Sequence, residues 1–150
     1  MACSNLRAPL GWSVAVGVLW AQGLALRLSA APWWAAVGGD GGAAAVVGAA
    51  VLELASLVAM AMALGAAVSA QRTGWPWTAM LIVSAAGMHA VWPWLLFGSH
   101  DVGLALAWAS VQALVLGAAA LVGLRWSPRV AALLAIPIAR LVLVAVAMPI

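Results

Sequence analysis

Five long apolar runs determine what this chain can fold into. They cover residues 9–28, 43–70, 75–97, 102–124 and 130–148, and charged, glycine or proline residues lie between them. A helix needs about 20 residues to cross the roughly 30 Å of hydrocarbon in a bilayer. The runs also lack the alternation of polar and apolar residues that a membrane β-barrel requires. The sequence therefore predicts an all-α integral membrane protein, with one domain over residues 1–150 that is a bundle of five transmembrane helices.

The composition argues against a soluble protein and against one that binds nucleic acid. Hydrophobic residues make up 68% of the 150 residues and charged residues 6%, whereas about 25% of a soluble domain is charged. The net charge is +3, but the six basic residues are scattered arginines that form no basic stripe. The only cysteine, Cys3, cannot form an intrachain disulfide or a cysteine metal cluster. We therefore expect membrane lipids, and no nucleic acid, among the partners, and no metal site.

The charges between the runs predict how the chain is oriented. Four arginines fall on one side of the expected membrane: Arg7, Arg72, Arg125 and Arg129. The other side holds Arg27, Asp40, His100 and Asp101. Because arginine and lysine concentrate in cytoplasmic loops, we expect the N-terminus on the cytoplasmic side and the C-terminus on the opposite side.

One strongly polar residue lies deep inside each apolar run, away from its ends. These residues are Gln22, Glu53, His89, Gln112 and Arg140. At a rise of about 1.5 Å per residue they lie roughly 9–16 Å from the non-cytoplasmic helix ends, which predicts a single intramembrane polar layer. Ionisable groups inside a membrane usually pair or face a cavity, so we expect an ion pair between Glu53 and Arg140. The layer would then hold the bundle together, form a ligand or proton site, or contact a partner.

Ten tryptophans accompany one phenylalanine and no tyrosine. Most lie near predicted helix ends, where amphipathic indoles favour the headgroup region. The segment from Pro32-Trp33-Trp34 to Gly38–Gly42 is expected to be a loop, because it is rich in glycine and contains a proline. Trp92 lies deeper and is a candidate for a ligand cavity, together with Trp33, Trp34 and His89. A single histidine such as His89 could ligate a tetrapyrrole metal, but a second ligand is lacking.

The C-terminal half resembles a known family. Residues 89–98 read His-Ala-Val-Trp-Pro-Trp-Leu-Leu-Phe-Gly, Pro137 follows at a similar distance, and Pro32-Trp33-Trp34 lies in the first expected loop. These features resemble the tryptophan-rich sensory protein family, also called the translocator protein (TspO/MBR) family. Its third helix reads Asn-x-x-Trp, then Pro, then Phe-Phe-Gly, and its first loop contains Lys-Pro-x-Trp. The resemblance implies a five-helix membrane protein that binds porphyrins or sterols.

The chain also departs from this family pattern. The third-helix Asn is His89, and the positions of the fifth-helix Tyr, Trp and terminal Asn read Ile138, Leu141 and Pro149. The resemblance therefore implies a divergent member that keeps the fold and has lost most of the ligand pocket. Any cofactor would be a tetrapyrrole (porphyrin or bacteriochlorophyll), a carotenoid or a lipid at the surface.

These observations lead to three functional hypotheses. The first is a non-enzymatic accessory subunit that packs against the helices of a larger membrane complex. Because family members in purple bacteria are associated with tetrapyrrole and photosynthesis control, a light-harvesting or reaction-centre complex in a bacterial inner membrane is the preferred host, followed by a respiratory complex. The second is a stand-alone sensor or transporter for porphyrin, another tetrapyrrole or a lipid. The third, an enzyme, is disfavoured because the sequence contains no catalytic constellation.

Overall fold

In the computed structural model, residues 7–36, 43–70 and 74–147 are described, and their side chains over 13–36, 45–70 and 74–146. These residues form α1 (Arg7–Ala36), α2 (Ala43–Ala70), α3 (Trp75–Pro93), the π-helical turn η1 (Trp94–Gly98), α4 (Val102–Leu124) and α5 (Pro128–Ala147). All five α-helices are long and apolar enough to cross a membrane. The predicted class, an all-α membrane protein with five spanning helices, is confirmed.

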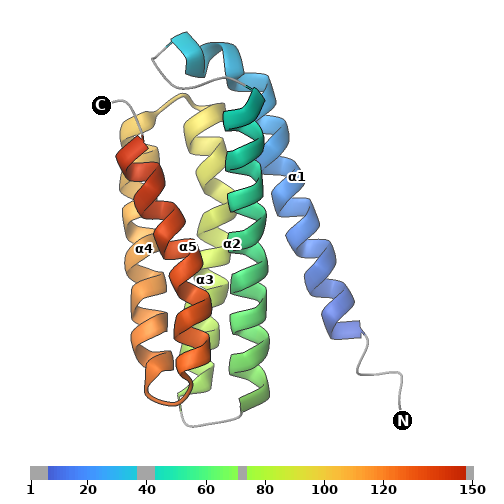
Figure 1. Cartoon of the computed structure of the whole chain (residues 1–150), viewed down its shortest axis with the longest axis vertical. Coiled ribbons are helices and arrows are strands. Elements are labelled where there is room, and N and C mark those ends of the chain that lie inside the picture. Colours follow the sequence, from blue (N-terminus) through green and yellow to red (C-terminus); the bar gives the residue numbers. More distant parts are fainter. Residues whose placement is uncertain (1–6, 37–42, 71–73, 148–150) are drawn as a thin grey trace.

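The helices α2, α3, α4 and α5 stand side by side as an upright bundle (Figure 1). Helix α4 packs between α3 and α5, and α2 packs on α3 and α5 from the other side. Helix α1 contacts α2, α3 and η1, and its N-terminal half leans away from the bundle (Figure 1). One end of the molecule is therefore built by five helices and the other by four.

The predicted limits of α2 and α4 agree with the structure, but the predicted end of the first helix was wrong. Helix α1 continues from Leu28 to Ala36, so Pro32, Trp33 and Trp34 are helical and not in a loop. A proline inside a helix removes one backbone hydrogen bond and bends the helix, and α1 bends near its C-terminal end across the top of the bundle (Figure 1). The expected glycine-rich loop, Gly38–Gly42, lies outside the described residues.

Proline also shapes the end of the third span. After Pro93 the helix widens into η1, where Ser99 N–H donates to Trp94 O at 2.9 Å. Such π-helical turns often occur at functional sites. The turn buries Leu96 and Phe97 against the end of α1.

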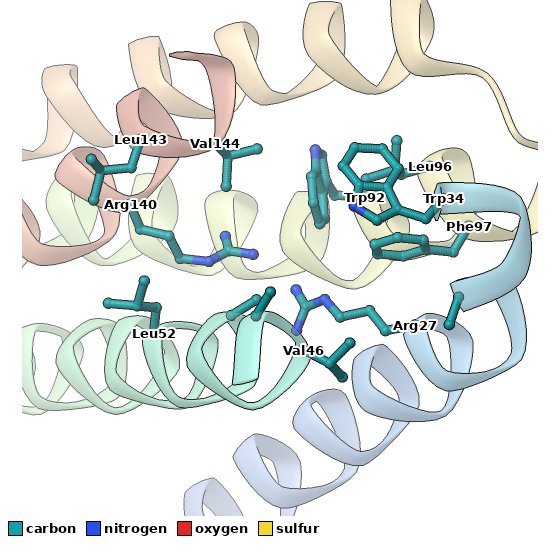
Figure 2. Close-up of a pocket in the computed structure, with 13 residues that line it drawn as sticks. Arg27, Trp34, Val46, Leu52, Trp92, Leu96, Phe97, Arg140, Leu143 and Val144 are labelled. Carbon is teal, nitrogen blue, oxygen red and sulfur yellow. The ribbon is translucent and has the colours of Figure 1, made fainter. Parts of the chain in front are cut away.

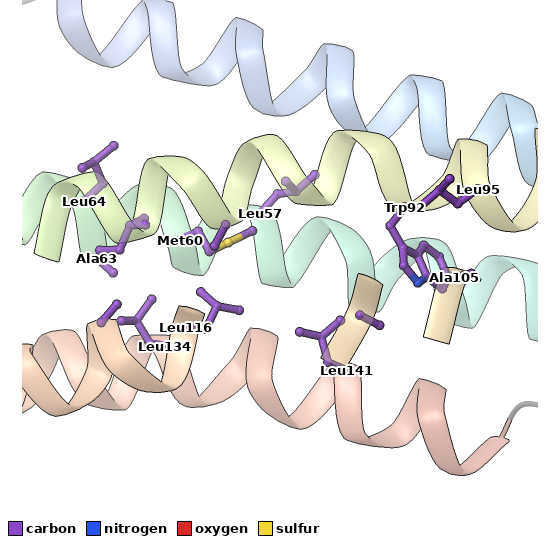
Figure 3. Close-up of a cluster of buried hydrophobic side chains, with 14 of the residues drawn as sticks. Leu57, Met60, Ala63, Leu64, Trp92, Leu95, Ala105, Leu116, Leu134 and Leu141 are labelled. Atoms are coloured by element: carbon purple, nitrogen blue, oxygen red, sulfur yellow. The ribbon is translucent and has the colours of Figure 1, made fainter. Parts of the chain in front are cut away.

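Small and apolar side chains pack the four-helix end of the bundle. Ala63, Ala67 and Ala119 are fully buried there, beside the larger Met60 and Leu116 (Figure 3). Alanine allows helix backbones to approach closely in a membrane, where association depends on van der Waals contact. This end is a close-packed apolar core.

Candidate functional site

Three of the five predicted layer residues form a hydrogen-bonded series across α2, α3 and α4. His89 Nε2 lies 3.1 Å from Glu53 Oε1, and His89 Nδ1 lies 3.4 Å from Gln112 Nε2. Gln112 Nε2 also donates to Ala85 O at 3.0 Å. All three side chains are buried. Because an amide nitrogen only donates, His89 Nδ1 is the acceptor, Nε2 carries the proton, and the imidazole is neutral.

His89 is therefore engaged on both of its ring nitrogens. Neither nitrogen is free to ligate the metal of a tetrapyrrole, which the sequence left open. The residue links Glu53 to Gln112 and holds the carboxylate in place.

The predicted ion pair between Glu53 and Arg140 was wrong, because Glu53 pairs with Arg27 of α1. Arg27 is 6% exposed, so it is an interior residue of α1 and not a charge at the membrane surface. Gly23, one turn before Arg27, allows α1 to lie close to the Glu53 carboxylate. A Cβ atom at Gly23 would lie 2.6 Å from Glu53 Oε1.

Arg140 is also buried, at 4% exposure, but it has a different environment. Its guanidinium carbon lies 5.3 Å from the centre of the Trp92 ring, a cation–π contact. Its Nη2 atom is buried without a hydrogen-bond partner among the described residues. The indole nitrogen of Trp92 is unpartnered in the same way.

A cavity of about 290 Å³ lies between these groups. Its polar wall consists of Arg27 and Arg140, whose guanidinium groups extend toward one another from α1 and α5 (Figure 2). Aromatic rings of Trp34, Trp92 and Phe97 form one side. Small and aliphatic residues complete it: Ala31, Ala45, Val46, Ala49, Leu52, Leu96, Leu143 and Val144.

The aromatic side of the cavity is held by contacts between α1 and η1. Trp34 meets Phe97 edge-on at 6.0 Å between ring centres, and Phe97 meets Trp92 at 6.1 Å. Arg27 lies over the Phe97 ring at 5.8 Å. The bend of α1 and the widened turn η1 therefore create the site together.

Two predicted site residues lie elsewhere. Trp33 does not line the cavity but packs on His100 at 4.4 Å between ring centres. Gln22 is exposed on α1 and takes no part in the buried cluster. Arg27 occupies the place in the layer that was expected for Gln22.

Sequence reasoning missed Arg27 and Phe97. Arg27 was assigned to a helix end because Pro32 was taken to lie in a loop. Phe97 was recognised only as part of the resemblance motif. A signal for Arg27 was present, since no glycine occurs between Arg27 and Gly38 and one proline can be tolerated in a helix with a bend.

The site is suited to hold an anion inside the membrane. Two guanidinium groups and one carboxylate are buried here, and the neighbouring imidazole is neutral. A cavity is present at this place in the structure. Its polar wall is made of arginines.

Comparison of the chain with models of known protein families, with curated proteins and with solved structures finds no match in any of the three. The function therefore has to be judged from the cavity and its residues.

Proposed function

We propose that this protein is a non-enzymatic membrane protein that binds an anionic amphiphile in the cavity between α1, α2, α3, η1 and α5. The observation that carries this proposal is Arg140, whose buried Nη2 atom has no partner among the described residues and which lines the cavity. A buried charge without a counter-charge is costly. An anionic ligand head would remove that cost by accepting hydrogen bonds from Arg140.

The rest of the cavity suits the apolar part of such a ligand. Ligand sites are mostly apolar, with a few polar groups that fix the orientation of the ligand, and here the polar groups are Arg27 and Arg140. Leu52 and Leu143 lie at the edge of the cavity and are exposed. In a membrane this edge faces lipid, so a hydrocarbon chain can enter laterally between α2 and α5.

The resemblance to the tryptophan-rich sensory protein family supports a ligand site but not its usual ligand. Trp34 and Trp92, which belong to the segments that carry the resemblance, line the cavity. A volume of about 290 Å³ is just below the range of about 300–1,000 Å³ that is typical of ligand pockets. It takes an anionic head and part of a chain more readily than a whole tetrapyrrole.

A titration of the purified protein in an uncharged detergent tests the proposal. Laurate is the anionic probe, and methyl laurate is the control with the same chain and no charge. We expect laurate to change the tryptophan emission saturably, because Trp34 and Trp92 line the cavity. Methyl laurate should give only the linear change of partitioning.

Two variants make this titration specific. Arg140→Gln should abolish the saturable change, whereas Arg129→Gln should not, because Arg129 is exposed at the opposite end of the bundle. Equal responses to laurate and methyl laurate would contradict the proposal. So would an unchanged response in Arg140→Gln.

A second function, accessory subunit of a larger membrane complex, is favoured by the outer face of α1. Gly17, Ala21 and Ala25 are exposed at intervals of four residues, and Gln22 is exposed beside them. Small residues let a neighbouring helix approach, and a polar amide can hydrogen-bond across the contact. The preferred host is a bacterial light-harvesting or reaction-centre complex, and the next is a respiratory complex. Native purification tests this, since a subunit would comigrate with its complex and Gln22→Leu would weaken the comigration.

We also propose a bacterial inner membrane with a cytoplasmic N-terminus as the location. With Arg27 inside the bundle, the exposed arginines with described side chains, Arg125 and Arg129, both lie at the α4–α5 turn, which supports this orientation. Cysteines introduced at Ser127 and Ser99 provide the test. Ser127→Cys should react from the cytoplasmic side and Ser99→Cys from the other side, and the reverse pattern would contradict the proposal.

A further inference from the structure

We propose that the head of the bound amphiphile carries one negative charge, so that the site selects monoanions over dianions. This inference rests on the proposed function and deepens it. It follows from the charge balance of the side chains buried around the cavity.

Four ionisable side chains are buried within the described part of the bundle: Arg27, Glu53, His89 and Arg140. The hydrogen bond from Gln112 makes His89 neutral, and Arg27 forms an ion pair with Glu53. Arg140 is left as a single excess positive charge. The other charged residues with described side chains, Asp101, Arg125 and Arg129, are exposed at the ends of the helices.

The excess charge fixes the charge of the best ligand. Inside a bundle surrounded by lipid an unbalanced charge is poorly screened, so the interior favours neutrality. One anionic group beside Arg140 gives a neutral interior. A head with two negative charges would leave one carboxylate without a counter-charge and would place it near Glu53.

The positions of the two arginines also indicate that the site binds a single negative charge. Arg27 and Arg140 extend toward one another across the cavity (Figure 2), but of these two arginines only Arg27 forms an ion pair with Glu53. The anion would therefore bind mainly to Arg140, with Arg27 as the second donor.

Two sources share this head chemistry. A fatty acid has a carboxylate with one charge, and an anionic glycerophospholipid has a phosphodiester with one charge. In both cases the hydrocarbon would leave past Leu52 and Leu143 into the bilayer. Competition of laurate with dioleoylphosphatidylglycerol separates these sources, because the tighter binder identifies the source.

The decisive comparison is between laurate and dodecylmalonate, which carries two carboxylates on one carbon at a similar chain length. It is made at about pH 8.5, well above the pKa of a carboxyl group. We expect laurate to bind at least about tenfold more tightly, a difference of about 1.4 kcal/mol. Protoporphyrin, with two propionates, should bind weakly as well.

Removal of one buried charge should change which ligand binds most tightly. In Glu53→Gln the interior has two excess positive charges, and dodecylmalonate should become the tighter ligand. In Arg27→Gln the remaining charges balance, so laurate should lose its advantage over methyl laurate. Arg129→Gln is the matched control, because it removes an exposed arginine without altering the interior. The helicity of each variant is checked by circular dichroism, and the wild-type comparison stands even if one variant does not fold.

The outcomes separate this inference from the proposed function. Arg140-dependent binding of laurate and dodecylmalonate with equal affinity would overturn the charge inference and leave the proposed function intact. Failure of laurate, phosphatidylglycerol and dodecylmalonate to bind would overturn both. Retention of the laurate preference in a folded Glu53→Gln protein would also overturn the charge inference.

Discussion

Near the α4–α5 turn, helices α2 to α5 pack through small apolar side chains, whereas toward the other end the same helices, joined by α1, enclose charges and a cavity. We call these regions the packed half, around Met60, Ala63 and Leu116, and the polar half, around Glu53 and Arg140. In Figure 3, Ala63 lies toward one end of the buried hydrophobic cluster and Trp92, which contacts Arg140, lies toward the other. The packed half is filled by side chains, whereas the polar half contains a cavity whose polar groups are Arg27 and Arg140.

Helix α1 joins the bundle through the polar half. Its interactions there are the Arg27–Glu53 ion pair, the hydrogen bond from Trp20 Nε1 to Ala50 O at 2.8 Å, and the ring contacts with Phe97 and His100. Its N-terminal half leans away from the packed half (Figure 1). The buried charges therefore do two things, since they attach α1 and shape the cavity.

The largest effect is expected from breaking the Arg27–Glu53 pair. Arg27→Leu leaves Glu53 as a buried charge without its main partner and should destabilise the protein by about 3–5 kcal/mol. The double change Arg27→Leu with Glu53→Leu should recover most of this loss. Unfolding by sodium dodecyl sulfate, followed by circular dichroism, measures both.

A second double variant identifies the partner. Glu53→Leu combined with Arg140→Leu should not recover stability, because it leaves Arg27 without a carboxylate. Recovery in this variant and not in the first would mean that Glu53 pairs with Arg140 instead.

The packed half should respond strongly to the loss of side-chain volume. Leu116 is 0% exposed, and Leu116→Ala should cost about 2–4 kcal/mol through lost packing contacts and the cavity left behind. Leu114, on the same helix, is 74% exposed. Leu114→Ala should therefore cost little, and equal losses in the same unfolding assay would mean that the packed half is not close-packed at Leu116.

Gly23 tests how closely α1 must approach the polar half. Gly23→Ala brings a Cβ atom to 2.6 Å from Glu53 Oε1, so either α1 or the carboxylate has to move. We expect a loss of about 1–3 kcal/mol, as for other overpacked sites. Gly17 has no neighbouring atom within 4 Å, and Gly17→Ala on the same helix should be neutral or slightly stabilising.

The sequence predicts the packed half better than the polar half. Length and apolar character are properties of single segments, so the five spans and the limits of α2 and α4 were predictable. The burial of Glu53, His89 and Gln112 also followed from their place within apolar runs. The partner of Glu53 could not be predicted, because it depends on the tilt of α1 and on a helix that continues through Pro32.

The cavity depends on the same features. It exists because α1 bends near its end and η1 widens after Pro93, and both deviations change the rotation of side chains about the helix axis. The hydrophobic pattern of the sequence does not reveal such a change, because its interpretation assumes regular helices. The resemblance motif drew attention to Trp34 and Trp92, but Arg27 and Arg140 give the cavity its charge, and the family pattern described above includes neither.

Apart from the controls, the smallest expected change in stability is that of Arg140→Met, and it is the only one of these changes expected to increase stability in the absence of ligand. Arg140→Met removes a buried charge that has no counter-charge, and replacing such a group by an apolar one of similar length relieves its desolvation cost. The change also removes the cation–π contact with Trp92, which is worth about 0.5–2 kcal/mol. We expect the ligand-free protein in uncharged detergent to gain about 1 kcal/mol of stability, whereas Arg27→Leu should lose several. With saturating laurate the wild-type protein should become more stable than Arg140→Met, because only the wild-type protein gains stability from binding. A large loss of stability in ligand-free Arg140→Met would show that Arg140 stabilises the fold, and would contradict its proposed role as a binding residue.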